Sequence, residues 1–171
     1  MIPSKAMEYA RQAYNLSLKL REPSADGWVQ FYLGRAYLLL GEYSNARDAF
    51  IKSVRIRDDL GQPFLSMEPL AGLVETALLM GDRDQASATL EKILGHLEKG
   101  GSLEGTDDPF RVYHICHQFL QEQKDPRARQ LLLNANQLLE AQVSKFNDET
   151  VRKMFVESFP WRKAIYDAAQ A

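Results

Sequence analysis

The sequence predicts an all-α protein built from repeated helix pairs. Apolar residues recur at intervals of three and four along almost the whole chain, which is the spacing of an α-helix. Several side chains also recur at an interval of forty residues, as Leu33, Leu73 and Tyr113 do. A period of roughly 20–50 residues is typical of stacked repeats, whose units bury their apolar faces against each other. No segment has the alternating pattern of a convincing strand.

The composition limits the class of protein. The 171 residues and the hydrophobic fraction of 45% are sufficient for one domain with a substantial core. A net charge of −2 argues against general electrostatic binding to nucleic acid or to an anionic membrane. The single cysteine, Cys116, excludes an internal disulfide. The first residues lack the apolar run of a signal peptide, and no run reaches the roughly 18 apolar residues of a membrane span. We therefore expect a cytoplasmic protein without nucleic-acid or membrane partners.

The opening helix is interpreted as half a repeat, residues 4–21, with Tyr9, Ala13 and Leu16 on one face. Its alanines match the second helix of the next unit at the forty-residue interval: Ala6, Ala10 and Ala13 precede Ala46, Phe50 and Ser53. A unit that lacks its first half suggests that the chain is a piece of a longer protein.

The first complete repeat is predicted over residues 26–60. Asp26 is the expected N-cap of its first helix, since a carboxylate can accept the free amides of the first turn. Gly41 is expected to end that helix, because glycine readily adopts positive φ. The second helix runs from about Tyr43 to Leu60.

The second repeat, residues 66–99, follows the same plan, with Ser66 as the cap and Gly81 at the turn. The third repeat, 106–145, starts at Thr106 and has an altered turn, because Ala128 comes two residues later than the period requires. Residues 147–169 are predicted to form a capping tail of one or two short helices. Five apolar residues are expected to anchor it: Phe155, Phe159, Trp161, Ile165 and Tyr166.

The unit that begins at Gly27 resembles a tetratricopeptide repeat. The matching residues are Leu33-Gly34, Tyr37, Gly41, Tyr43, Ala46 and Phe50, at the spacing of that family. The resemblance is partial in the second unit, which keeps Leu73, Gly81, Ala86 and Leu90, and weak in the third. It implies a right-handed α-α superhelix of about three helix pairs in one domain, 1–171. Gly34 and Ala46 would let paired helices approach closely, while Tyr37 and Phe50 fill the space between units.

A period of forty exceeds the usual tetratricopeptide length of 34. Longer units of this size are similar to those of large bacterial signalling ATPases of the MalT-like family. The stretch Gly105-Thr106-Asp107-Asp108-Pro109 and the later Arg152 and Phe155 resemble the last units of such arrays. This finer resemblance implies a place within a larger signalling protein.

The residue patterns give little support for catalysis or metal binding. His114, Cys116 and His117 form a cluster, but the two histidines occupy the packing positions of Gly34 and Tyr37, and a zinc site needs further ligands. No Gly-x-Ser-x-Gly turn or phosphate-binding loop is present. We therefore expect a protein that is not an enzyme and has no cofactor or metal.

Runs of like charge are interpreted as structural. The acidic doublets Asp58-Asp59 and Asp107-Asp108 lie at predicted helix ends and are expected to be solvated or to act as caps. The basic run Arg55-Ile56-Arg57 is expected to belong to a solvated face.

The family resemblance implies that the first helix of each unit lines a concave groove. By this register the predicted partner-binding residues are Trp28, Phe31, Arg35, Leu38, Glu75, Arg111 and Gln118. Aromatic residues and arginines are common energetic anchors of interfaces. The alternative is that Phe31, Leu38 and Leu39 simply complete the core. The lysine and asparagine set with which some family members bind a peptide carboxylate is missing, so that mode is not expected.

The predicted function is binding of a protein segment or a neighbouring domain in this groove, within a cytoplasmic regulatory protein. The alternative is a sensor, in which a small inducer held in the groove switches an attached effector domain. The sensor hypothesis predicts that a small molecule stabilises the folded chain, whereas the protein-binding hypothesis does not.

Overall fold

The structure is a computed structural model that describes residues 3–20, 22–103 and 105–170. Within these ranges the chain is helical apart from turns and short connections, and no strand occurs. The all-α prediction is therefore confirmed. The chain divides into two compact units, Met1–Asp107 and Asp108–Ala171, called here the first and second units. The single domain over 1–171 and the right-handed superhelix stay predictions.

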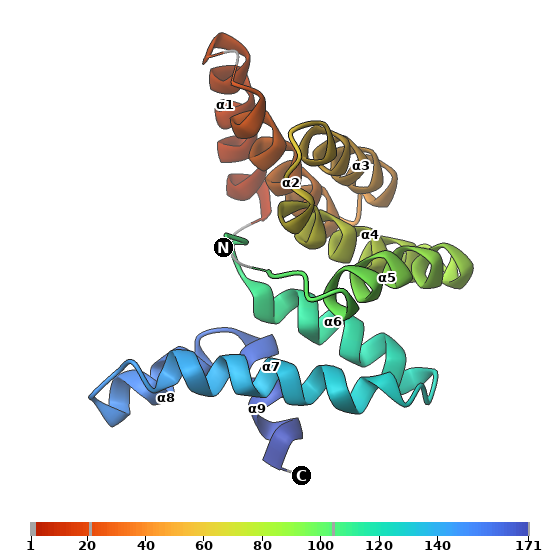
Figure 1. Cartoon of the computed structure of the whole chain (residues 1–171). Helices are drawn as coiled ribbons and strands as arrows, with labels where there is room; N and C mark the ends of the chain where they lie inside the picture. The colour runs from red at the N-terminus through yellow and green to blue at the C-terminus, as the bar shows by residue number, and fades with distance from the viewer. Residues whose placement is uncertain (1–2, 21, 104, 171) are drawn as a thin grey trace. The chain divides into compact units, whose positions relative to one another are not determined.

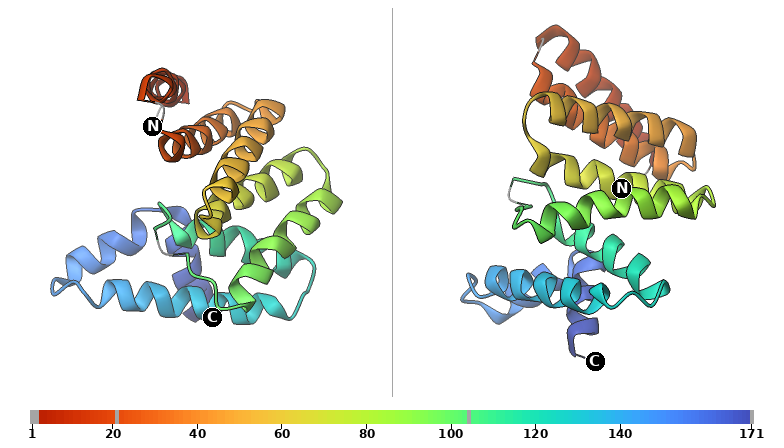
Figure 2. Two further views of the ribbon diagram at one scale, coloured as in Figure 1. Left: turned by 45° about the horizontal axis from the view of Figure 1, so that its top comes forward. Right: turned by 45° about the vertical axis from the view of Figure 1, so that its right-hand side comes forward.

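The first unit holds two helix pairs and the helix that precedes them (Figure 1). Its elements are α1 (Pro3–Leu20), α2 (Pro23–Leu39), α3 (Tyr43–Asp59), a short 3₁₀ helix η1 (Pro63–Ser66), α4 (Met67–Leu79) and α5 (Arg83–Glu98). Each α-helix packs against the next, and α2 also contacts α4 (Figure 2). The two predicted pairs are thus present, with helix ends close to those expected except at the start of α2.

The tight turns within the two pairs have the same geometry. Gly41 has a φ of 75° and Gly81 a φ of 78°, the left-handed region that glycine adopts without a Cβ clash. The amide after each glycine donates to a carbonyl of the last helical turn, at 2.9 Å in both cases: Glu42 to Tyr37 and Asp82 to Ala77. This pattern satisfies carbonyls that the helix end leaves free. The predicted role of both glycines is confirmed.

The predicted N-cap at Asp26 is wrong, because α2 begins three residues earlier. Pro23 is its first residue, and the Glu22 carboxylate accepts the Ser24 amide at 3.2 Å. Proline is well suited to the first helical position, where its fixed φ helps and its missing N–H costs nothing. Asp26 instead accepts a hydrogen bond from the Ser17 hydroxyl of α1, at 3.2 Å.

The hydroxyl caps predicted for the second and third repeats, Ser66 and Thr106, are also wrong in mechanism. Ser66 does precede α4, but its hydroxyl donates to Asp58 at 2.8 Å and makes no capping bond. The Thr106 hydroxyl donates to the Leu103 carbonyl at 2.6 Å. The cap of the following helix is Asp108, whose carboxylate accepts the Phe110 amide at 3.2 Å.

The ring of Phe50 joins the two pairs of the first unit. It is fully buried, and it lies against two glycines, Gly34 of α2 and Gly72 of α4. A Cβ built on Gly34 would lie 2.6 Å from the ring, and one built on Gly72 would lie 2.5 Å from it. Both distances are too short for real carbon contacts, so the ring occupies space that two missing side chains leave. The role predicted for Gly34 and Phe50 is confirmed.

The apolar face predicted for α1 faces solvent. Tyr9 is 63% exposed and Leu16 56% exposed, and Ala13 is also exposed. The neighbouring face packs instead, with Met7 in a core cluster that includes Val29. A helix with two adjacent apolar faces does not reveal from sequence which one packs. The side chains of Ala6 and Ala10, and Arg21 at the end of the predicted half repeat, lie outside the described residues.

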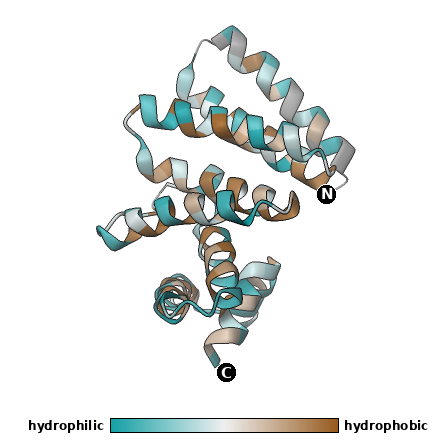
Figure 3. Ribbon diagram, turned by 90° about the vertical axis from the view of Figure 1, so that its right-hand side faces the viewer, coloured by the Kyte–Doolittle hydropathy of each residue, from teal (hydrophilic) through white to brown (hydrophobic). Residues whose placement is uncertain are grey.

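The second unit contains α6 (Pro109–Glu122), α7 (Arg127–Val143), α8 (Glu149–Glu157) and α9 (Pro160–Gln170). The altered turn that the sequence predicted is present, with Lys124 at a φ of 55° in place of glycine. The core cluster of this unit draws on α6, α7 and α9: Phe110, Ala135, Leu139 and Ile165. Figure 3 shows hydrophobic and hydrophilic residues alternating along the helices, as amphipathic packing requires.

The predicted tail of short helices is confirmed as α8 and α9, but its anchors are only partly right. Ile165 is buried, and Trp161 and Phe155 are half-buried against the core of the second unit. Phe159 and Tyr166 are exposed, so neither anchors the tail. A polar contact holds α9 as well.

That contact is made by the buried Asp108 at the start of α6. Its carboxylate accepts the Trp161 indole N–H at 2.8 Å and the Arg162 guanidinium at 3.2 Å. The Arg162 guanidinium also lies 4.4 Å from the centre of the Phe155 ring. One carboxylate therefore caps α6 and ties α9 to it.

Candidate functional site

An exposed stripe runs along α2. Its residues, Trp28, Tyr32, Arg35 and Leu39, follow the i, i+4, i+7, i+11 spacing that places side chains on one helix face. Tyr32 is 41% exposed and Leu39 63% exposed, while Trp28 and Arg35 are half-buried. This face of α2, the "α2 stripe", overlaps the groove that the sequence predicted, but it includes Tyr32, which the prediction missed.

The aromatic members of the stripe rest on the core below them. Trp28 and Tyr32 are stacked, with ring centroids 6.2 Å apart. Phe31 lies beneath, with its centroid 5.1 Å from that of Tyr32 and 6.2 Å from that of Phe50. Phe31 is only 2% exposed. It therefore supports the stripe and belongs to the core, as the alternative interpretation of that residue expected.

An acidic side chain of the same unit sits on the stripe. The Asp107 carboxylate lies 3.5 Å from the Arg35 guanidinium and is hydrogen-bonded to the Tyr32 side chain. Arg35 also lies over the Phe31 ring, 5.7 Å from its centre. The Asp107 amide donates to the Glu68 carboxylate of α4 at 2.7 Å, which fixes the chain at this point. The prediction that Asp107 is solvated is partly right, because its side chain is 44% exposed while it also contacts Arg35 and Tyr32. The residue that caps α6 is Asp108.

The surroundings of Tyr32 favour its protonated form. Burial, together with the Asp107 and Glu68 charges, raises the pKa of Tyr32 to about 12, although Arg35 acts in the opposite direction. The phenol therefore remains a hydrogen-bond donor at neutral pH. The carboxylate of Asp107 accepts this hydrogen bond.

Two opposite charges are buried close to the stripe. Arg57 of α3 and Glu68 of α4 are 1% and 2% exposed. The Arg57 guanidinium lies 4.7 Å from the centre of the Trp28 ring and donates to Ser24 at 3.2 Å and to Gln62 at 2.9 Å. Burial lowers the pKa of Arg57, while Glu68 acts to raise it.

The prediction that Arg57 belongs to a solvated face is therefore wrong. Gly27 makes its burial possible, because a Cβ there would lie 2.9 Å from the guanidinium carbon. The short sequence pattern around Arg57 carries no sign of this, since the glycine lies thirty residues earlier.

The predicted groove residues fall in both units. Trp28, Phe31, Arg35, Leu38 and Glu75 belong to the first unit, and Arg111 and Gln118 belong to α6 of the second. Leu38 and Glu75 are half-buried, Arg111 is buried, and Gln118 is exposed. A groove that combines the two units stays a prediction.

In the histidine–cysteine cluster of α6, Cys116 is buried, whereas His114 and His117 are half-buried. Cys116 is fully buried, and burial raises the pKa of its thiol to about 12, so it is not a nucleophile at neutral pH. Burial also lowers the pKa of His114 and of His117, which favours neutral rings. Among the described residues, no group of three or more His, Cys, Asp or Glu side chains is placed to hold a metal ion.

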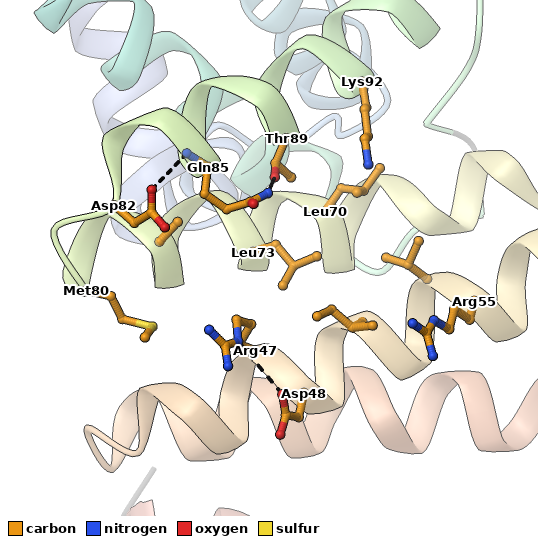
Figure 4. A pocket seen from close by; sticks show the side chains of 13 residues that line it. Arg47, Asp48, Arg55, Leu70, Leu73, Met80, Asp82, Gln85, Thr89 and Lys92 are labelled. Carbon is orange, nitrogen blue, oxygen red and sulfur yellow. Dashed lines mark hydrogen bonds and ion pairs between the residues drawn. The ribbon is translucent and has the colours of Figure 1, made fainter.

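A pocket with a volume of about 550 Å³ lies between α3, α4 and α5 (Figure 4). Its lining comes from Arg47, Asp48, Ile51, Val54, Arg55, Leu70, Leu73, Ala77, Met80, Asp82, Gln85, Thr89 and Lys92. None of the seven predicted groove residues is among them.

Comparisons with known proteins identify no relative. No family model matches the chain, and neither the curated proteins nor the solved structures include a significant match. None of the helices that the structure describes combines the length and the apolar character needed to cross a membrane.

Proposed function

We propose that this chain is a helical-repeat module of the tetratricopeptide type that binds a protein segment or a neighbouring domain through the α2 stripe. The observation that carries the proposal is the composition of the stripe: a tryptophan, a tyrosine, an arginine and a leucine on one exposed face. Tryptophan, tyrosine and arginine are the residue types most often found at the energetic centre of interfaces. The proposed role is binding and not catalysis.

The contacts of the stripe suggest what the partner carries. Arg35 and Tyr32 already hold one carboxylate, that of Asp107. The Asp107 and Arg35 side chains are 44% and 29% exposed, so a competing carboxylate can reach them. Leu39 offers an apolar contact one turn further along α2. The proposed partner segment therefore has an acidic residue followed by an apolar one.

We further propose that α6 and α7 form a third helix pair, which continues the two pairs of the first unit as a right-handed superhelix. Glu75, Arg111 and Gln118 would then continue the groove and set the charge preference of the partner. The chain would be the repeat region of a cytoplasmic signalling protein, as the resemblance to MalT-like ATPases implies.

The test uses a phage-displayed library of random 12-residue peptides, selected against the purified full chain. Selected peptides are synthesised, and their affinities are measured by fluorescence anisotropy. We expect acidic and apolar residues to be enriched together. The Tyr32→Ala/Leu39→Ala variant should weaken binding about tenfold or more, since central interface residues often contribute 2 kcal/mol or more. A matched control is Leu133→Ala/Met154→Ala, which removes two exposed apolar side chains of the second unit.

A third variant, Asp107→Ala, distinguishes this site from other surfaces. Removing the internal carboxylate should tighten peptide binding several-fold, because the peptide no longer displaces Asp107 from Arg35 and Tyr32. Equal affinity of all variants, or a selection that enriches no peptide, would count against the α2 stripe as the partner surface.

The alternative, a sensor that responds to a small inducer, has one observation in its favour. The pocket between α3, α4 and α5 has about 550 Å³ of space, within the range of roughly 300–1,000 Å³ typical of small-molecule sites.

A further inference from the structure

The pocket between α3, α4 and α5 has an apolar floor and two chemically different ends. The floor is formed mainly by aliphatic residues of α3 and α4: Ile51, Val54, Leu70, Leu73 and Ala77. In Figure 4 side chains of α5 line one wall and those of α3 the other. Asp82 and Met80 lie at one end of this space, whereas Arg55 and Lys92 lie toward the other.

The cationic end lacks an anion. Among the described residues, neither Arg55 nor Lys92 forms a hydrogen bond or an ion pair. The two acids of the lining are occupied elsewhere: Asp48 lies 3.8 Å from Arg47, and Asp82 accepts the Gln85 amide at 3.0 Å. The lining thus has three cations and two acids, and the excess positive charge is on the Arg55 and Lys92 side.

We propose that this pocket binds a small amphipathic anion, with its carboxylate between Arg55 and Lys92 and its apolar body along the floor. The length of the body follows from the helix that forms one wall. Asp48 and Arg55 are seven residues apart, which corresponds to about 10 Å along a helix. A medium-chain carboxylic acid of eight to ten carbons has this length.

The pocket fits a small molecule better than a peptide. A bound peptide backbone needs hydrogen-bond partners, since its buried polar groups must be satisfied. The uncharged polar side chains of the lining are Gln85 and Thr89, and these bond to each other at 3.1 Å. An aliphatic body has no such requirement.

This site is separate from the α2 stripe, and the inference does not depend on the proposed partner surface. Leu73 and Glu75 are two residues apart on α4, so they project from nearly opposite sides of the helix. Leu73 lines the pocket, whereas Glu75 belongs to the face predicted to line the groove. The pocket can therefore bind its ligand whether or not the stripe binds a protein.

The experiment titrates decanoate into the full chain at pH 7.5 and follows amide shifts by two-dimensional ¹⁵N NMR. Two probes of similar length serve as comparisons, 1-decanol without charge and decyltrimethylammonium with the opposite charge. We expect saturable shifts confined mainly to α3, α4 and α5. Decanoate should bind about tenfold more tightly than decanol, because two partly exposed cations each add a modest charge contribution.

Two variants test the placement. Arg55→Gln/Lys92→Gln should remove the preference for decanoate over decanol while leaving decanol binding unchanged. The matched control, Lys52→Gln/Lys99→Gln, makes the same charge change at exposed positions outside the lining. Ile51→Trp should block both probes by filling the floor, and its melting temperature shows whether it remains folded.

Each remaining outcome would overturn the proposal. Such outcomes are that decanoate does not bind saturably at millimolar concentration, or that decanoate and decanol bind with equal affinity. Amide shifts centred on α2, or a control variant that loses the preference for decanoate, would also overturn it. Binding of an acidic peptide at this pocket without binding of decanoate would overturn it too. Failure of the peptide selection on the α2 stripe leaves these outcomes unaffected, so the two proposals fail separately.

Discussion

In the first unit a buried aromatic ring fits between the two helix pairs, whereas in the second unit a buried carboxylate adds a polar contact to the apolar packing of the tail helix α9. Phe50 is buried against Gly34 and Gly72, and the contact is purely one of shape. Asp108 accepts hydrogen bonds from Trp161 and Arg162, and the contact is polar and charged. The polar contact attaches α9, a helix outside the α6–α7 pair, to the start of α6.

The turns within the helix pairs also differ between the two units. Gly41 and Gly81 take positive φ in the first unit, and Lys124 does so in the second. A lysine in this region costs more than glycine, by an amount of order 1 kcal/mol. The glycine turn is therefore shared by the two pairs of the first unit and is absent from the turn between α6 and α7.

The largest effect is expected for Phe50→Ala. Removal of a fully buried phenylalanine costs about 3–5 kcal/mol of unfolding free energy, because both transfer energy and packing are lost. Urea unfolding measures the total loss of unfolding free energy. Hydrogen exchange with mass spectrometry shows in which helices the amide protection falls. If the units are independent, α3 and α4 lose protection while α6 to α9 keep theirs. Equal loss in both would show that the chain unfolds as one domain, and a total below about 1 kcal/mol would contradict the role of the ring.

Asp108→Asn tests the other side of the comparison. It should cost about 1.5–3 kcal/mol, as typical for hydrogen bonds to charged groups, because it leaves Arg162 without its carboxylate. The Arg162 side chain is only 13% exposed, and its Nε already has no partner among the described atoms. Hydrogen exchange in α9 measures the effect. The control Asp167→Asn removes an exposed pair with Lys163 and should change stability by less than about 1 kcal/mol. Similar losses in the two variants would show that Asp108 makes only a surface contact.

Gly72→Ala sharpens the argument about shape. The added methyl would overlap the Phe50 ring, and overpacking costs about 1–3 kcal/mol, offset by up to about 1 kcal/mol of helix propensity. Phe50→Leu in the same chain should recover part of the loss. Gly95→Ala is the matched control, since its Cβ meets no atom within 4 Å and it should stabilise α5 by up to about 1 kcal/mol. Stabilisation by both alanines would mean that the ring moves freely.

Much of this fold could be predicted from the forty-residue interval. The interval located both pairs of the first unit and the glycines of their turns, whereas the close approach at Gly34 was implied by the resemblance to a tetratricopeptide repeat. The caps could not be predicted in the same way, because Asp26, Ser66 and Thr106 share a spacing but each has a different partner in three dimensions. Gly72 was also missed, since it lies 38 residues after Gly34 and so falls outside the register.

The candidate sites were less predictable for a physical reason. Whether Arg57 is buried depends on Gly27 and Trp28, which are close in space but distant in sequence. Tyr32 could have been found from the spacing of Trp28 and Arg35 on one helix face. The pocket could not be predicted, because its lining comes from three helices whose relative positions the sequence pattern does not give. Whether Arg55 and Lys92 have partners also depends on where the neighbouring side chains lie.

The smallest effect concerns the titration of Tyr32. Its pKa is raised to about 12 in the folded chain, against about 10 for an unperturbed tyrosine. A raised pKa means that the folded state favours the protonated phenol. The corresponding stability is fully present below about pH 10 and is lost as the pH rises toward about 12. NMR of chains labelled with ¹³Cζ-tyrosine follows this titration, and a Tyr32→Phe variant assigns the signal.

Asp107→Asn should lower the pKa of Tyr32, because it removes a charge and weakens a hydrogen bond that both favour the protonated form. Burial remains, so the pKa should stay above that of a free tyrosine. Asp48→Asn, which changes an acid on α3 beside Arg47, should leave the Tyr32 titration unchanged. An identical titration in the wild type and Asp107→Asn would mean that Asp107 does not rest on the phenol in solution. The α2 stripe would then be open to a partner without any internal competitor, and Asp107→Ala would not tighten peptide binding.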